Sequence, residues 1–395
     1  MTKFRFESAR EAERPRAFLV TVAIGRVVYA DAAEELAELV VSDGLDVAGT
    51  LAARRDKPDA ATYLGSGKIE EIKALALAAK AQVVVFDAAL TAAQERNIAQ
   101  SLGLAVLDRT ELILQIFQKR AKSREGRLQV ELARLEHLAT RLVRGWTHLE
   151  RQRGGLGKTG GPGEKQIELD RRLIASRVKQ LKDQLKKLQR QRDTQRRSRN
   201  EGDTMTVSLV GYTNAGKSTL FNQLTRAEAY AANQLFATLD TTARRCWIAG
   251  EDYVVASDTV GFIRGLPHQL VNAFKSTLDE TVHADLLLHV VDSSSPVREE
   301  QMASVRNVLE EIDAADVPMI TVFNKIDLSG LAPAIQRHED GRVKSVTVSA
   351  TSGEGLDLLR RAIEEFLVDW RERTKSEPRE LEDWEKEAQT LSDIL

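Results

Sequence analysis

Short apolar and β-branched runs alternate with helical stretches in the first third of the chain. Strands are expected at residues 17–24, 46–52, 83–87 and 105–107, and helices near residues 31–41, 68–80 and 92–102. Strands that alternate with helices in this way form a mainly parallel sheet. Residues 1–116 are therefore predicted to form a small α/β domain.

A seven-residue apolar period replaces this pattern after residue 127. Its first seam consists of Leu128, Leu132, Leu135, Ala139, Leu142, Trp146 and Leu149, and its second of Ile174, Val178, Leu181, Leu185 and Leu188. Each seam is typical of a helix that packs on another helix. Because the glycine-rich stretch 153–163 separates them, residues 117–203 are predicted to form a long antiparallel helical hairpin. Residues 190–200 contain no apolar side chain, so we expect a frayed helix end or a linker there.

Apolar strands return at residues 206–210, 253–257, 319–323 and 343–348, and an amphipathic helix is expected at 219–224. Each of these strands leads directly into a short polar string. For residues 204–374 the pattern predicts a mostly parallel sheet with helices on both faces, followed by a short polar tail at 375–395. With 395 residues, 42% of them hydrophobic, the chain can bury two or three cores. The predicted fold class is therefore α/β multidomain.

The net charge of −2 hides an uneven distribution of charge along the chain. Residues 117–200 contain 24 Lys and Arg but only 9 Asp and Glu, and this segment is predicted to be an arm that meets a polyanion. Aromatic side chains are few in the arm, with only Trp146 in its first helix, which favours recognition of the backbone of folded RNA over stacking on single-stranded bases. A solvated helical face without a partner is the alternative that the charge pattern leaves open.

Several classes of protein are disfavoured by composition. Cys246 is the only cysteine, which excludes an internal disulfide and a cysteine-based zinc site, and the six histidines lack metal-binding spacing. No apolar run reaches the ~18 residues of a membrane span, and no secretory signal is evident. We expect a cytoplasmic protein without an integral membrane segment, and a monomer.

The first polar string has the spacing of a phosphate-binding loop. Strand 206–210 leads into Gly211, four further residues, Gly216, Lys217 and Ser218, and then a helix. Backbone N–H groups of such a loop surround phosphates, the lysine reaches the outer phosphates, and the hydroxyl can bind Mg²⁺. The predicted contact residues of this loop are Gly211, Tyr212, Thr213, Asn214, Ala215, Gly216, Lys217, Ser218 and Thr219.

Two further strings fit the segments that sense a terminal phosphate. In the string Phe236, Ala237, Thr238, Leu239 and Asp240, the hydroxyl of Thr238 is the best candidate for the γ-phosphate and Mg²⁺, with Thr241 and Thr242 as close rivals. In the string Asp258, Thr259, Val260 and Gly261, Asp258 is predicted to hold Mg²⁺ through water and the Gly261 amide to meet the γ-phosphate. Loss of that phosphate would release both segments.

The last two strings identify the base. The carboxylate of Asp327, in the string Asn324, Lys325, Ile326 and Asp327, can accept two hydrogen bonds from guanine, whereas adenine offers neither donor there. Lys325 can lie over the base, and the string Ser349, Ala350 and Thr351 can supply a backbone contact to the guanine oxygen. Five strings in this order predict a site for GTP and GDP.

The position after Gly261 departs from the pattern of many GTPases. A glutamine commonly orients the attacking water there, but this chain has Phe262, which cannot do so. Slow intrinsic hydrolysis is predicted, with a partner that completes the site. Asn214 could hold a potassium ion against the phosphates, so the catalytic candidates are Lys217, Thr238, Gly261 and Asn214.

Over most of its length the chain resembles the HflX family of ribosome-associated translational GTPases, within the group that includes Obg and Era. The resemblance rests on the phosphate loop extended to Asn222, on residues 258–264 and 266–268, and on four strings outside the GTPase domain at 63–68, 108–114, 125–132 and 153–164. It implies binding to the large ribosomal subunit, contact of the arm with ribosomal RNA, and splitting or rescue of stalled ribosomes, notably under heat stress. Family members usually have Pro where this chain has Thr241, a small departure in the first switch segment.

Other functions remain open at this level. A GTP-timed regulator outside the ribosome, with or without a membrane, would use the same nucleotide strings. So would an assembly factor without splitting activity. An ATP-driven RNA remodeller is disfavoured because the glycine-containing stretches at 65–68 and 157–159 are not complete phosphate loops.

Overall fold

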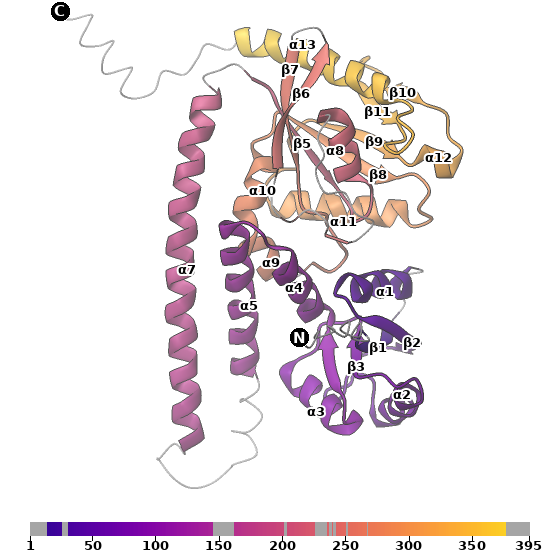
Figure 1. Ribbon diagram of the computed structural model, residues 1–395, viewed down its shortest axis with the longest axis vertical. Coiled ribbons are helices and arrows are strands. Elements are labelled where there is room, and N and C mark those ends of the chain that lie inside the picture. The colour runs from indigo at the N-terminus through magenta and orange to yellow at the C-terminus, as the bar shows by residue number, and fades with distance from the viewer. Residues whose placement is uncertain are drawn as a thin grey trace, which may run out of the picture.

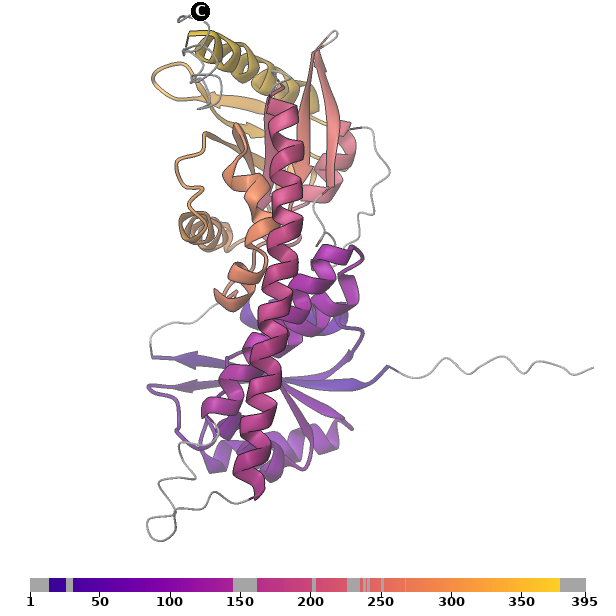
Figure 2. The same cartoon turned by 90° about the vertical axis from the view of Figure 1, so that its left-hand side faces the viewer.

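The computed structural model describes residues 14–25, 31–144, 162–200, 204–225, 235–236, 239, 242–249, 252–266 and 268–376. Two α/β domains lie one above the other, and a pair of helices runs alongside them (Figure 1). The view from the side shows one very long helix, α7 (Pro162–Asn200), running along both domains (Figure 2). Within these described ranges, no helix is both long enough and apolar enough to cross a membrane.

The N-terminal domain alternates strands and helices as the sequence predicts. Its elements are β1 (Arg16–Ile24), α1 (Ala32–Ser42), β2 (Asp46–Arg55), α2 (Ser66–Ala78), β3 (Val83–Phe86), α3 (Ala92–Leu102) and β4 (Ala105–Asp108). All four strands are parallel, in the order β2-β1-β3-β4. Local sequence sets some of the boundaries. For example, Thr91 and Gln94 form a reciprocal capping box that starts α3.

The helical hairpin is confirmed, with two differences from the expectation. The short helix α4 (Arg109–Arg120) precedes α5 (Arg124–Arg144), and α7 does not fray at residue 190 but continues to Asn200. Lys, Arg and Gln are good helix formers, so the helix continues without an apolar seam. Leu132 of α5 and Leu181 of α7 are buried, whereas Trp146, Leu149 and most of the glycine-rich stretch lie outside the described residues.

The C-terminal domain is a mixed sheet with helices on both faces. Its strands are β5 (Thr206–Gly211), β6 (Thr242–Ala249), β7 (Asp252–Asp258), β8 (Leu286–Asp292), β9 (Met319–Asn324), β10 (Ala334–Arg337) and β11 (Val343–Thr347). They lie in the order β10-β11-β9-β8-β5-β7-β6, and only the edge strands β10 and β6 are antiparallel to their neighbours.

The helices of this domain divide between the two faces of the sheet. Helices α8 (Lys217–Thr225) and α13 (Leu356–Ser376) contribute to the apolar cluster on one face. Helices α9 (His268–Ala273), α10 (Lys275–Val282) and α11 (Arg298–Glu311) contribute to the cluster on the other, and α12 (Ile326–Ser329) is a single turn after β9. This arrangement confirms the predicted fold class.

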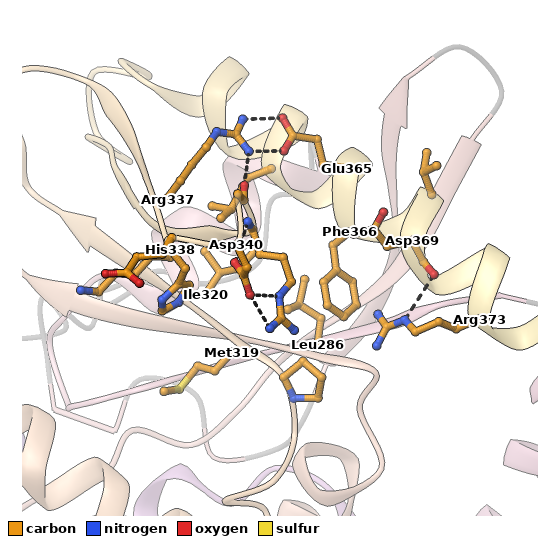
Figure 3. A pocket seen from close by; sticks show the side chains of 18 of the residues that line it. Leu286, Met319, Ile320, Arg337, His338, Asp340, Glu365, Phe366, Asp369 and Arg373 are labelled. Carbon is orange, nitrogen blue, oxygen red and sulfur yellow. Dashed lines mark hydrogen bonds and ion pairs between the residues drawn. The ribbon is translucent and has the colours of Figure 1, made fainter.

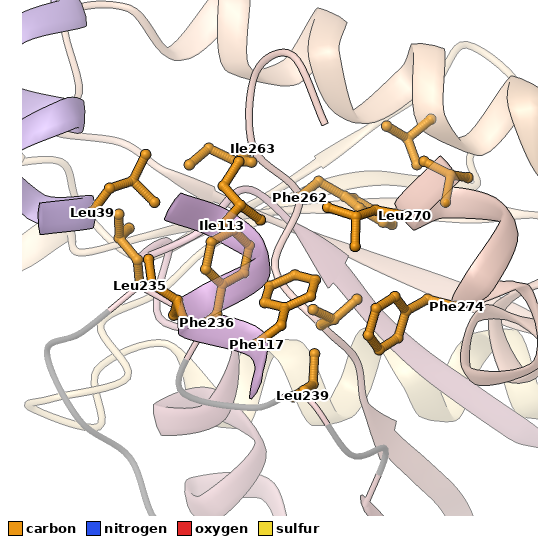
Figure 4. Packing of buried hydrophobic residues seen from close by; sticks show 14 of the residues in the cluster. Leu39, Ile113, Phe117, Leu235, Phe236, Leu239, Phe262, Ile263, Leu270 and Phe274 are labelled. Carbon is orange, nitrogen blue, oxygen red and sulfur yellow. The ribbon is translucent and has the colours of Figure 1, made fainter. Parts of the chain in front are cut away.

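One apolar cluster is continuous between the two domains. It contains Leu39 of α1 and Ile113 and Phe117 of α4 together with Phe262 and Phe274 of the C-terminal domain. Figure 4 shows these side chains converging, with Phe117 at the centre. The domains are therefore joined by a shared core, which positions the segments before β6 and after β7.

Candidate nucleotide-binding site

The phosphate loop follows the carboxyl end of β5 in the middle of the sheet. Two glycines in it are required by space. A Cβ on Gly211 would lie 2.2 Å from the backbone oxygen of Val290, and one on Gly216 would lie 2.2 Å from Nδ2 of Asn324. Asn214 has a left-handed backbone, with φ of 62°, which Asn adopts more readily than most residues. This tight loop leaves its backbone N–H groups near the start of α8, where they can bind phosphates.

Lys217 is buried inside the phosphate loop. Its Nζ donates to the carbonyl oxygens of Gly211 at 3.0 Å and Tyr212 at 2.8 Å. Burial lowers the pKa of Lys217 to about 8, although the nearby Asp258 carboxylate opposes this shift. The ammonium group is thus held within the loop, where phosphate oxygens could replace the carbonyl partners.

Ser218 and Asp258, the two predicted magnesium ligands within the described residues, are adjacent. Ser218 Oγ donates to Asp258 Oδ2 at 2.7 Å, with Ser218 in the first turn of α8 and Asp258 at the carboxyl end of β7. Hard oxygen ligands suit Mg²⁺, which usually keeps several waters and binds phosphates as well. Nowhere in the described ranges do three or more His, Cys, Asp or Glu side chains gather as a metal site.

The residues predicted to bind the base are brought together at the ends of β9 and β11. Asn324 Nδ2 donates to the Ala215 carbonyl at 2.9 Å, and the Ala350 amide donates to Asn324 Oδ1, also at 2.9 Å. Asn324 thereby ties the phosphate loop to the loop after β11. The neighbouring Ile326 is buried, whereas Thr351 is exposed.

Two side chains orient the ionic groups of the base site. Ser349 Oγ donates to Asp327 Oδ1 at 2.6 Å, and Lys325 Nζ pairs with Asp292 Oδ2 at 2.7 Å. Asp292 was not among the predicted site residues, although its place at the end of β8 would have pointed to it. Asp327 itself is exposed, so its carboxylate is accessible to a guanine.

The segment after β7 packs directly against the phosphate loop. The Thr213 amide donates to the Phe262 carbonyl at 2.7 Å, and the Phe262 amide donates to the Gly211 carbonyl at 3.1 Å. Thr259 Oγ1 donates to the Leu209 carbonyl at 2.6 Å, and Val260 is buried. The Phe262 side chain is fully buried in the shared apolar cluster, away from any role in orienting water.

The first switch segment is described only in part. Phe236 and Leu239 are buried in the shared cluster, where the Phe236 ring meets Phe117 edge-on at 4.6 Å. Ala237, Thr238, Asp240 and the rival Thr241 lie outside the described residues. The other rival, Thr242, begins β6 and pairs with Asp258 across the sheet. The choice among the three threonines therefore stays a prediction.

A buried polar network connects the N-terminal domain to the phosphate loop and to the segment after β7. Glu35 of α1 accepts hydrogen bonds from the hydroxyl of Tyr212, from Arg109 Nη2 at 2.6 Å and from Arg264 Nη2 at 2.9 Å. Burial alone would lower the pKa of Arg109, but its ion pairs with Glu35 and Asp87 raise it. Sequence reasoning missed this network, and its only local signal was an acidic residue on the apolar face of a helix.

A hollow of about 1710 Å³ lies in the C-terminal domain, away from the carboxyl ends of the strands where the nucleotide strings lie. It is lined by the starts of β8 and β9, the β10–β11 hairpin and α13 (Figure 3). Some of its charged groups pair with one another, as Arg337 and Glu365 do through two hydrogen bonds. Because the nucleotide strings follow the carboxyl ends of the strands, this hollow is separate from them.

Comparisons with known proteins agree with this geometry. Residues 30–118 match a family model described as the N-terminal region of a GTP-binding GTPase, residues 120–199 match its middle region, and residues 206–325 match a 50S ribosome-binding GTPase. The chain is 51% identical over 335 residues to GTPase HflX of Escherichia coli (strain K12), which covers 85% of this chain and 78% of that protein.

One further relative and one solved structure are also similar to most of this chain. GTPase HflX of Magnetococcus marinus is 50% identical over 334 residues, covering 84% of this chain and 77% of its own length. Among solved structures, a GTP-binding protein from Sulfolobus solfataricus in complex with GDP is 24% identical and has a TM-score of 0.46, covering 90% of this chain and 99% of that one.

Proposed function

Because this chain belongs to the GTPase HflX family, and is thus a GTPase, we propose that it binds the large ribosomal subunit and dissociates or rescues stalled ribosomes when GTP is bound. The observation that carries this proposal is the basic helix α7, built onto a domain with a guanine-nucleotide site. The family model described as 50S ribosome-binding supports the choice of subunit. A cytoplasmic site of action follows from that partner.

The arm has the charge that contact with ribosomal RNA requires. Helix α7 contains 13 Lys and Arg against 5 Asp and Glu. Three acidic side chains, Glu168, Glu131 and Glu136, take up three of these cations in ion pairs. Exposed cations without an ion pair among the described residues remain, namely Arg171, Lys179, Lys186 and Lys187. Such a row of cations would bind RNA phosphates with strong salt dependence.

The end of the arm that contacts the C-terminal domain lies next to the segment expected to respond to the γ-phosphate. Helix α5 packs on α9, and Gln189 Nε2 of α7 donates to Asp279 Oδ2 of α10 at 2.6 Å. Helix α9 begins seven residues after Gly261, and α10 follows directly after α9. A movement of that segment on GTP hydrolysis would therefore reach the arm directly, which would make ribosome affinity depend on the nucleotide.

The chemistry proposed for the site uses Mg²⁺ and, through Asn214, potassium. Mg²⁺ would be held by Ser218, by Thr238 and, through water, by Asp258, and would neutralise charge on the phosphates. Since the buried Phe262 cannot orient water, hydrolysis should be slow alone and stimulated by the ribosome. Equal hydrolysis rates in potassium and sodium buffers would remove the role proposed for Asn214.

Sedimentation tests the proposal. In the presence of a non-hydrolysable GTP analogue, the protein should co-sediment with large subunits at moderate salt and convert intact ribosomes into subunits. The triple variant Lys179→Glu/Lys186→Glu/Lys187→Glu should lose both properties. The matched control Lys57→Glu/Lys344→Glu/Lys375→Glu changes the net charge equally at exposed positions outside the arm and should retain both. Failure of the unaltered protein to co-sediment would refute the ribosomal function.

A further inference from the structure

Glu35 is a buried carboxylate that reaches from the N-terminal domain into the nucleotide site. It lies on the inward face of α1 and is 6% exposed. Its Oε1 accepts from the hydroxyl of Tyr212, and its Oε2 accepts from Arg109 and Arg264. Three donors from three separate segments of the chain therefore meet at one side chain.

The Tyr212 hydroxyl links this carboxylate to both walls of the expected γ-phosphate pocket, namely the phosphate loop and the segment after β7. Tyr212 follows Gly211 in the phosphate loop, and its hydroxyl accepts from the Arg264 amide at 2.8 Å. Arg264 in turn lies three residues after Gly261. The two walls are in close contact, because a Cβ on Gly261 would come within 2.9 Å of Thr213 Cγ2 and 3.0 Å of Lys217 Nζ. A small shift between the walls would thus change the space for the phosphate.

The ion pairs around Glu35 hold its side chain in place. Arg109 also binds Asp87, and Arg264 also binds Asp31 at 3.0 Å, so the two guanidinium groups lie among three carboxylates. Arg109 Nη2 further donates to the Arg264 carbonyl at 3.0 Å. Charge-assisted bonds of this kind hold geometry more tightly than neutral ones. The network therefore acts as a rigid brace between α1, α4, the phosphate loop and the segment after β7.

We propose that Glu35 is a positioning residue for GTP hydrolysis, which acts through Tyr212 and Arg264 to hold the Gly261 segment in register with the phosphate loop. The site needs such a brace because Phe262 offers no side-chain group to orient water, so backbone groups near Gly261 must be placed accurately. Misplacement by about 1 Å can cost on the order of a hundredfold in rate. This role goes beyond the proposed ribosomal function, since it operates in the isolated protein.

Three variants of the full chain test the brace by single-turnover GTP hydrolysis and by GDP binding. Tyr212→Phe removes one hydroxyl, Glu35→Gln removes the charge, and Glu34→Gln removes the same charge at the exposed neighbouring position. In Tyr212→Phe and Glu35→Gln the hydrolysis rate should fall by about tenfold or more, while GDP affinity stays within about twofold. Glu34→Gln should match the unaltered protein in both measurements.

The double variant separates positioning from two independent structural losses. If both residues act through one brace, Tyr212→Phe/Glu35→Gln should hydrolyse GTP no more slowly than the slower single variant. The proposal is overturned if Tyr212→Phe, folded by circular dichroism, hydrolyses GTP within twofold of the unaltered rate. Equal losses in GDP affinity and hydrolysis rate would also overturn it, because the brace would then act on nucleotide binding in general. If Glu35→Gln fails to fold, Tyr212→Phe alone decides.

Discussion

Phe117 joins the N-terminal domain to the first switch segment, and its truncation should loosen that junction. The side chain is 2% exposed in the shared cluster. Its ring meets Phe236 edge-on at 4.6 Å and 87°, and Phe274 at 5.1 Å and 81°. Phe236 has a left-handed backbone, with φ of 55°, which a bulky residue adopts only when its surroundings enforce it. Phe117→Ala therefore removes packing that restrains a strained position.

The size of the effect follows from these contacts. Truncation of a buried Phe to Ala typically lowers the free energy of unfolding by about 3–5 kcal/mol. Edge-to-face pairs contribute about 0.5–1.5 kcal/mol each beyond burial, so about 1–3 kcal/mol of the loss should belong to the two contacts between Phe117 and the C-terminal domain. A docking equilibrium weakened by that amount would shift by roughly 5- to 150-fold.

Urea denaturation and hydrogen exchange measure the two parts of this prediction. Phe86→Ala is the matched control, because Phe86 is fully buried in a cluster confined to the N-terminal domain. Both variants should lose stability, but only Phe117→Ala should accelerate exchange in peptides that contain Phe236 or Phe274. A loss below about 1 kcal/mol, or equal exchange of these peptides in the two variants, would refute the coupling argument.

Three further predictions concern the nucleotide site and pH. Lys217→Ala should weaken GTP binding by roughly 100-fold by equilibrium titration and leave the circular dichroism spectrum unchanged, and retained affinity would remove this lysine from the phosphate site. Asp327→Asn should weaken GTP binding by roughly 10- to 100-fold with little effect on ATP, and unchanged guanine preference would contradict the base assignment. Burial, with Arg306 and Lys217 nearby, lowers the pKa of His289 from its ordinary value of about 6.5 to about 4. Between these two pH values the unfolded state binds a proton at His289 and the folded state does not. The stability linked to His289 is therefore fully present above pH 6.5 and falls as the pH drops toward 4. Between pH 7 and pH 5 the free energy of unfolding of the unaltered protein, measured by urea denaturation, should fall by about 2 kcal/mol more than that of His289→Gln. Equal losses in the two proteins would contradict this prediction.

Much of the candidate nucleotide site could be outlined from the sequence because the members of each of its strings are consecutive in the chain. The spacing from Gly211 to Ser218 sets the loop, and the carboxyl ends of parallel strands meet at one edge of a sheet. Asp258 and Asn324 therefore come near that loop by virtue of their place after apolar strands. The end of α7 could not be predicted in the same way. Good helix formers continue a helix without the apolar period on which the expectation of a linker rested.

Contacts between the domains had no comparable signature in the sequence. Glu35 and Tyr212 are 177 positions apart, and nothing in either local pattern indicates that they bond. Strands, helices and loop motifs depend on neighbouring residues, so the sequence specified the GTPase chemistry and the basic arm. The docking of α1 and α4 on the segments around the γ-phosphate site depends on how two apolar surfaces and their buried charges fit together. Only the folded chain reveals that fit, and with it the connection between the N-terminal domain and the nucleotide site.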